Sequence, residues 1–142
     1  MFAKVQTFLQ QRQLKKDLLA FLAEMDKNLE LFYVMDQRQF ILDGFLNNAW
    51  DPVRDTAIVK KHEPTRMYAK AVEEFNNVVK EYKQYEAWYA SDLKNKTQDN
   101  AKKLHGMKQD LDSRLKGMEA VIIPAGQALE KEMLALGILK NA

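Results

Sequence analysis

The chain has 142 residues, of which 46% are hydrophobic, enough to bury the core of a single domain spanning residues 1–142. Its 22 Lys and Arg residues against 20 Asp and Glu residues leave a net charge of +2, so we expect no specific nucleic-acid partner. There is no cysteine, which excludes disulfides, thiolate zinc sites and a cysteine nucleophile.

The same composition bears on where the protein acts. A chain without cysteine suits a reducing compartment. The N-terminal residues lack the apolar core of a signal peptide, and nowhere do about 18 apolar residues run without a charge, as a membrane span requires. We therefore expect a soluble, cytoplasmic protein with no membrane span.

The first part of the chain predicts a long helix. Its apolar residues recur at steps of three or four, which places them on one helical face, or seam: Leu14, Leu18, Phe21, Met25, Leu29, Phe32 and Met35. The apolar pattern continues to Leu46, and Gly44 with Asn47 and Asn48 indicates the helix end. Residues 1–10 are out of phase with this seam, which allows a separate N-terminal arm that carries Phe2, Val5, Phe8 and Leu9.

Two acidic residues followed by proline predict helix starts, because the acid accepts free N–H groups and proline fits the first turn. Asp51-Pro52 predicts a short helix over 52–61, and Glu63-Pro64 predicts a long one over 64–93. The seam of the long helix is Tyr68, Val72, Phe75, Val79, Tyr82, Tyr89 and Leu93. Residues 94–100 contain no apolar residue and predict a turn, with Thr97 as the N-cap of the last helix. Because this segment has no Gly or Pro, a continuous helix is the alternative.

The last helix, predicted over 104–136, has the longest seam: Leu104, Met107, Leu111, Leu115, Met118, Ile122, Ala125, Leu129, Met133 and Leu136. Pro124 inside it removes one backbone hydrogen bond, at a cost of roughly 3 kcal/mol. Because the seam keeps its phase across the proline, we expect a kink within one helix. A break there would instead divide the helix into two segments.

These elements predict an all-α fold. We expect an antiparallel up-down bundle of three long helices, or four segments if Pro124 breaks the last, plus one short connecting helix. The antiparallel order follows from the first connection, residues 47–63, of which we expect half to be helical. Such a connection is too short to run back along a helix of about 50 Å.

Residues that bind metals or perform covalent chemistry are sparse. Di-iron bundles need Glu-x-x-His pairs, and neither His62 nor His105 has Glu three residues before it. Glycine-rich phosphate loops and the Gly-x-Ser-x-Gly and His-Glu-x-x-His motifs are absent. We therefore expect no metal, no cofactor and no catalytic residue.

His105 is the strongest candidate for reactivity. It falls on the face opposite the seam, with Lys102 and Lys108 within one turn to steady a phosphoryl group. The stretch His105-Gly106-Met107-Lys108 resembles histidine phosphotransfer domains, and this resemblance implies a phosphotransfer protein as the alternative function. Gln109 departs from the small residue that the family usually carries there, which would crowd a receiver domain.

A second alternative lies in the segment from Leu31 to Trp50, which is the richest in aromatic residues. An apolar pocket with a few convergent polar groups binds small ligands between the helices of a bundle. Asp36, Arg38 and Asp43 supply such groups, although core packing explains the same aromatics and Asp36 and Arg38 also fit a surface pair.

Trp88 contradicts the pattern around it. It falls on the polar face of the 64–93 helix, in line with Lys70, Glu74, Asn77, Glu81 and Gln84. Because tryptophan is frequent at binding hot spots, we expect Trp88 to contact the arm residues Phe2, Val5, Phe8 and Leu9 or a partner chain. The contact with the arm forms either within the monomer or across a two-fold dimer.

The sequence as a whole favours a non-enzymatic helical-bundle protein that acts through protein–protein contacts. Such a protein serves as an adaptor, a chaperone-like protein or an assembly component. Its partner is another protein or a second copy of this chain in a homodimer. This interpretation rests mainly on the absence of catalytic motifs, since a fold by itself does not imply a function.

Overall fold

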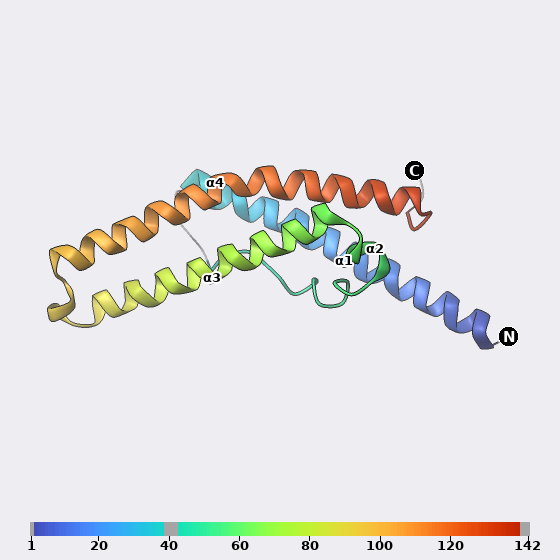
Figure 1. The fold of residues 1–142 in the computed structure, drawn as a ribbon, viewed down its shortest axis with the longest axis horizontal. Coiled ribbons are helices and arrows are strands. Elements are labelled where there is room, and N and C mark those ends of the chain that lie inside the picture. Colours follow the sequence, from blue (N-terminus) through green and yellow to red (C-terminus); the bar gives the residue numbers. More distant parts are fainter. Residues whose placement is uncertain (1, 39–42, 140–142) are drawn as a thin grey trace.

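The computed structural model describes residues 2–38 and 43–139. It contains the helices α1 (Phe2–Arg38), α2 (Ala57–Lys60), α3 (Glu63–Ser91) and α4 (Gln98–Ala135), with a 3₁₀ turn η1 (Leu93–Asn95) between α3 and α4. Figure 1 shows three long helices in an elongated bundle and no strand in the described part of the chain. The all-α bundle of three long helices with a short connecting helix is thus confirmed.

Helix α4 packs against both other long helices and is antiparallel to each (Figure 1). Its buried side chains follow the predicted seam from Leu111 to Met133. The helix runs without interruption through Pro124, and Ile122 and Ala125 on either side of the proline are both buried. The alternative of four segments therefore does not occur. At the start of α4, the Thr97 hydroxyl accepts the Asn100 N–H (3.1 Å) and confirms the predicted N-cap.

Helix α1 differs from the prediction at both ends. It begins at Phe2 and is unbroken, so residues 2–10 continue the helix and project beyond the bundle in Figure 1. At the other end it stops at Arg38, and residues 43–50 are irregular, which contradicts a helix extending to Leu46. Phe40, Ile41 and Leu42 lie outside the described residues.

The short helix is also shorter than predicted. Residues 51–55 form turns, and the helical segment α2 begins only at Ala57. The Asp51 side chain lies 3.4 Å from Arg54 and caps no helix, while the Trp50 carbonyl accepts the N–H groups of Val53 and Arg54. The Trp50 ring packs against Phe21, with 5.8 Å between the ring centres. This contact holds the start of the turn against α1, and a turn forms where a longer helix was expected.

The connection from α1 to α3 runs back along the bundle, and the expectation that it is too short to do so is wrong. Residues 43–50 run opposite to both helices: Asp43 pairs with Lys83, Phe45 with Asn76, and Ala49 with Glu24. Helices α1 and α3 are therefore parallel to each other (Figure 1). An irregular chain reaches about 3.3 Å per residue, twice the rise of a helix, which supplies the missing length.

Two asparagines hold this returning segment. Asn28 of α1 accepts the Leu46 N–H (2.7 Å) and donates to the Leu46 carbonyl (3.0 Å) and to the Tyr68 hydroxyl (2.6 Å). Asn76 of α3 accepts the Phe45 N–H (2.8 Å) and donates to the Phe45 carbonyl (2.9 Å). Each amide thus satisfies both backbone groups of one residue, as a neighbouring strand would. We call these contacts the asparagine clamp.

The clamp also explains one glycine. Gly44 has φ +103°, and a Cβ placed there would lie 2.3 Å from Asn76 Oδ1. A side chain at this position would therefore both strain the backbone and displace the amide that holds Phe45.

Tyr68 is the third member of the buried polar network. Burial, opposed by its hydrogen bond with Asn28 and assisted by the charge of Glu24, raises the pKa of Tyr68 to about 12. The phenol therefore stays neutral at ordinary pH, which leaves the Asn28 contact intact.

Replacing Asn28 with alanine tests the clamp. The variant leaves the Leu46 backbone groups and the Tyr68 hydroxyl without their partner, so we expect unfolding in urea to show a loss of about 2–4 kcal/mol. Asn77→Ala, at an exposed position of α3, is the matched control, because it makes the same change of helix propensity without a buried partner. Equal effects of the two variants would contradict the clamp.

Pro124 provides a second test. Its side chain is exposed while α4 continues through it, so Pro124→Ala should leave the free energy of unfolding unchanged or raise it by up to about 3 kcal/mol. Urea denaturation measures this change. A loss of several kcal/mol would mean that the proline sets a backbone geometry on which the bundle depends.

Candidate protein-interaction site

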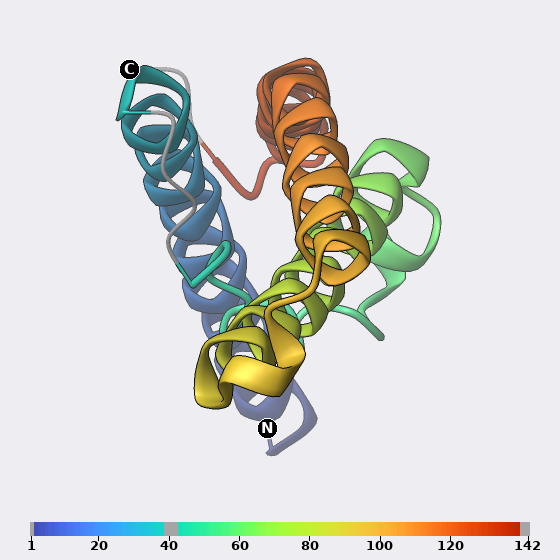
Figure 2. The ribbon, with the colours of Figure 1, turned by 90° about the vertical axis from the view of Figure 1, so that its left-hand side faces the viewer.

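Helices α3 and α4 extend beyond α1 as a two-helix hairpin, on the left in Figure 1. Fully buried side chains end at Val79 in α3 and begin again at Leu111 in α4. Between these positions Tyr82, Tyr85 and Leu104 are only half-buried, because just two helices cover them. The hairpin, which points toward the viewer in Figure 2, therefore presents more of its apolar surface to solvent than the centre does.

Side-chain hydrogen bonds make the turn of the hairpin well defined. The Trp88 carbonyl accepts from Ser91 Oγ (2.7 Å) and Asn95 Nδ2 (2.9 Å) at the end of α3. Asn100 Nδ2 donates to the Asn95 carbonyl (2.8 Å), and the Asp92 carboxylate accepts the Lys94 N–H (3.1 Å). These bonds satisfy backbone groups that the ends of two helices leave free.

Two apolar side chains stand outward at this end of the hairpin, Trp88 in the last turn of α3 and Leu93 in η1. Trp88 is 46% exposed, and its ring lies 5.4 Å from that of Tyr85. Leu93 is 83% exposed, contrary to its predicted place on the α3 seam, because α3 ends at Ser91 and Leu93 belongs to η1. We call Trp88, Leu93 and the partly covered Tyr85 the hairpin tip.

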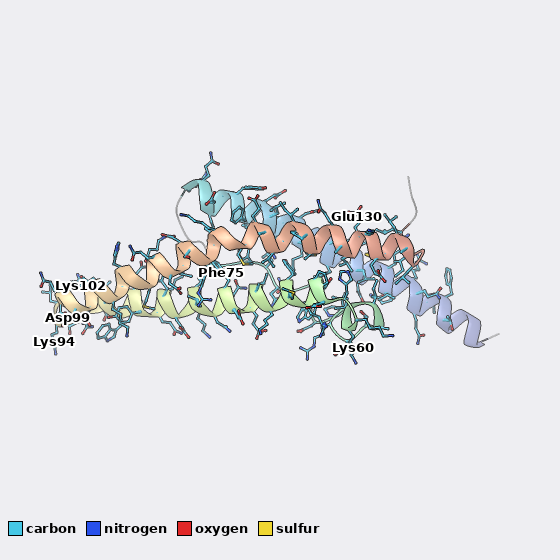
Figure 3. All side chains as sticks on the ribbon, turned by 45° about the horizontal axis from the view of Figure 1, so that its top comes forward. Lys60, Phe75, Lys94, Asp99, Lys102 and Glu130 are labelled. Carbon is cyan, nitrogen blue, oxygen red and sulfur yellow. The ribbon has the colours of Figure 1, made fainter. Side chains whose placement is uncertain are left out.

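Charged residues of both signs surround the tip, with Asp92 and Asp99 among the lysines. Lys103 Nζ lies 4.8 Å from the centre of the Tyr85 ring, a distance typical of a cation–π contact. Figure 3 labels Lys94, Asp99 and Lys102 at this end of the molecule. The tip thus exposes tryptophan and tyrosine, two residue types that are enriched at protein-binding surfaces.

Tyr82 forms the base of the hairpin. Burial first, and then the hydrogen bond and charge of Glu86 and the charge of Asp112, raise the pKa of Tyr82 to about 12. Its neutral hydroxyl donates to Glu86 Oε2 at 3.0 Å. This bond orients the ring and gives it a structural role.

The predicted contact between Trp88 and the N-terminal residues does not form within one chain. Figure 1 places the start of α1 and the hairpin at opposite ends of the molecule. Phe8 and Leu9 are 62% and 55% exposed. Phe2 and Val5 belong to α1, but their side chains lie outside the described part of the structure. Contact of Trp88 with a partner chain stays a prediction.

His105 is exposed on α4 within the hairpin. Of the two lysines expected beside it, Lys102 is exposed and Lys108 pairs with Asp112 at 2.6 Å. One of the two lysines is therefore already paired with a carboxylate of its own helix. Phosphotransfer by His105 stays a prediction.

The aromatic segment 31–50 divides its rings between the core and the surface, where Tyr33 is exposed. Within its described parts, 31–38 and 43–50, Phe32 and Phe45 are buried, and the Phe45 ring lies 5.0 Å from that of Phe75. Asp36 and Arg38 are both exposed. Phe32 and Asp36 also line an open pocket of about 590 Å³ together with Pro124 of α4, and ligand binding there stays a prediction.

No group of three or more His, Cys, Asp or Glu residues in the described part of the chain is arranged to hold a metal ion. No described helix is both long enough and apolar enough to cross a membrane. Comparisons of the chain with protein-family models, curated proteins and solved structures find no match.

Trp88 exposure gives a direct test of this geometry. In a Trp50→Phe variant, where Trp88 is the remaining tryptophan, we expect fluorescence that an added soluble quencher reduces readily, because half of the side chain meets solvent. In Trp88→Phe the remaining Trp50, which packs against Phe21, should be quenched less. Stronger quenching of Trp50 than of Trp88 would contradict the described exposure of the tip. A bound partner should protect Trp88.

Proposed function

We propose that this protein is a non-enzymatic adaptor that acts through protein–protein contacts at the hairpin tip. The observation that carries the proposal is the exposure of Trp88, in the last turn of α3, and of Leu93, in η1, at a helix end held by hydrogen bonds. A rigid aromatic anchor loses little conformational entropy on binding, so it contributes strongly to affinity. The tip carries charges of both signs, so the rim of the partner's contact surface should carry charges complementary to each.

The overall shape supports this role. The hairpin extends the tip away from the three-helix centre, so a partner meets the tip without contacting the rest of the bundle (Figure 1). Self-association as a homodimer would give the adaptor two tips. We propose that it acts in the cytoplasm, since a chain without cysteine suits a reducing compartment.

Photocrosslinking from Leu93 tests the proposed function. A photoreactive residue at Leu93, introduced in the source cell, should form crosslinks to a defined set of proteins, identified by mass spectrometry. Trp88→Ala should reduce these crosslinks by about tenfold or more, as expected for loss of a hot-spot residue. Circular dichroism should show an unchanged helix content.

The control is Met67→Ala, which removes another exposed apolar side chain from α3. Proteins whose crosslinks require Trp88 and not Met67 are the adaptor's partners. Crosslinks that are the same with and without Trp88 would contradict the proposal.

A further inference from the structure

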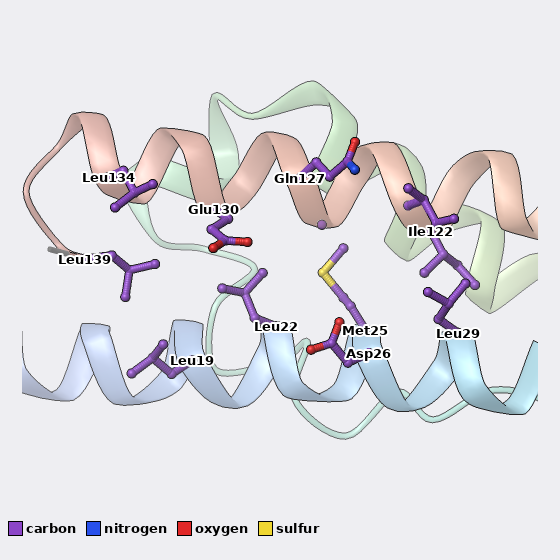
Figure 4. A pocket seen from close by; sticks show the side chains of 12 residues that line it. Leu19, Leu22, Met25, Asp26, Leu29, Ile122, Gln127, Glu130, Leu134 and Leu139 are labelled. Carbon is purple, nitrogen blue, oxygen red and sulfur yellow. The ribbon is translucent and has the colours of Figure 1, made fainter. Parts of the chain in front are cut away.

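A groove of about 580 Å³ runs between α1 and α4. Figure 4 shows Leu19, Leu22 and Leu29 of α1 on one side and Ile122 and Leu134 of α4 on the other. Gly126 of α4 also lines it, and the nearest neighbour to a Cβ built there is the Met25 methyl group at 3.9 Å. The groove is thus open between two antiparallel helices and has both apolar and polar side chains in its lining, at the place that a further helix would occupy in a bundle.

Two carboxylates lie in this groove. Asp26 of α1 and Glu130 of α4 are among its lining residues, and Figure 4 shows both between the helices. Within the described chain neither forms an ion pair. The groove therefore favours an occupant that is apolar on one face and positively charged beside it.

The first turns of α1 have these properties. Residues 7–13 are exposed, with Phe8 and Leu9 as the large apolar side chains. The basic residues between positions 7 and 16 are Arg12, Lys15 and Lys16, and no acidic residue precedes Asp17. We call residues 7–16 the α1 arm.

The arm has no route to the groove of its own chain. Arm and groove wall belong to one unbroken helix, Phe2–Arg38, so the arm continues straight past the groove. A second copy of the chain, in contrast, brings an arm that is free to enter. The charges of arm and groove are complementary, and this complementarity selects a second copy as the occupant.

The surface area agrees with such an association. The chain exposes 9940 Å². A compact monomer of its mass, 16.5 kDa, would expose about 7,600 Å². The area by which the chain exceeds a compact monomer is larger than the roughly 800 Å² that each partner buries in a standard interface.

We propose that two copies of this chain form a two-fold dimer in which the α1 arm of each lies in the α1/α4 groove of the other. A two-fold axis close to Leu19 makes the two α1 helices antiparallel. It places Leu9 opposite Leu29 of the partner subunit and Arg12 opposite Asp26 of the partner subunit. The contact is isologous, so it closes at two copies.

This arrangement gives the adaptor its geometry. The arms meet at the centre of the dimer, and the two hairpin tips point away from each other at its far ends. The dimer would then bridge two copies of a partner. The inference rests on the self-association proposed above, but not on what the tips bind.

Charge reversal tests the arm in the groove. Sedimentation equilibrium of the intact protein should give a dimer, and Arg12→Glu or Asp26→Arg should each weaken it by about tenfold or more. The double variant places opposite charges together again and should restore the dimer. Lys60→Glu, at an exposed position of α2, is the control that changes net charge alone.

Filling the groove gives an independent test. Gly126→Leu puts a side chain into the groove, while the matched control Gly117→Leu puts the same side chain on a part of α4 where a Cβ meets no neighbour within 4 Å. We expect the first variant to be a folded monomer and the second a dimer, with folding checked by circular dichroism.

The outcomes separate this inference from the proposed function. A monomer at every accessible concentration, or a dimer that the Arg12, Asp26 and Gly126 variants leave unchanged, overturns the arm-in-groove dimer. Trp88→Ala should leave the dimer intact. If the chain is a monomer and Trp88→Ala still abolishes the crosslinks from Leu93, the adaptor function is supported and the dimer is rejected.

Discussion

The asparagine clamp is the interaction on which the rest of the bundle depends. Asn28 and Asn76 each hold both backbone groups of one residue in the returning segment, Leu46 and Phe45. Without these bonds the segment would bury unpaired N–H and C=O groups, which costs more than its apolar side chains recover. With them, an irregular stretch of chain fills the space between two parallel helices and places Phe45 against Phe75.

The clamp also determines the direction of α3. Because residues 43–50 return along α1, helix α3 starts beside the middle of α1 and runs past its C-terminal end (Figure 1). Helix α4 then comes back along both. This offset leaves the molecule with two uncovered ends, the α1 arm at one and the hairpin at the other, and both proposed contacts lie at these ends.

The chemistry of the two ends is different. The hairpin tip is rigid and aromatic, with its turn held by Asn95 and Asn100. The α1 arm is a single helix whose exposed apolar residues are accompanied only by positive charge before Asp17. A rigid aromatic surface suits a specific partner, whereas a single helix with a charged face requires a groove to cover it.

Local patterns allowed much of the fold to be predicted. The step of three and four residues in α4 placed Leu111 to Met133 in the core, because period alone decides which side of a helix is apolar. Thr97 was identifiable as a cap because its hydroxyl acts on an N–H three residues away. Trp88 could be singled out in the same way, as an aromatic residue on a polar face.

Other features depended on residues far apart in the chain. Asn28 continues the buried α1 positions Met25 and Phe32 in steps of three and four, and a polar residue in that place was the available signal of a buried hydrogen bond. The predicted seam included the neighbouring Leu29 and therefore left out Asn28. The direction of the first connection was likewise mispredicted, because that expectation assumed a helix where the chain is irregular.

The sequence by itself determined the all-α class, the three long helices, the cap at Thr97 and the buried face of α4, because each follows from residues within a few positions of one another. Only the tertiary structure decided that α1 and α3 are parallel, that Leu93 stands outward and that the α1 arm lies far from Trp88. The direction of α3, and with it the distance between the α1 arm and Trp88, depends on which partners Asn28 and Asn76 find some 20 to 40 residues away. No local period encodes such contacts.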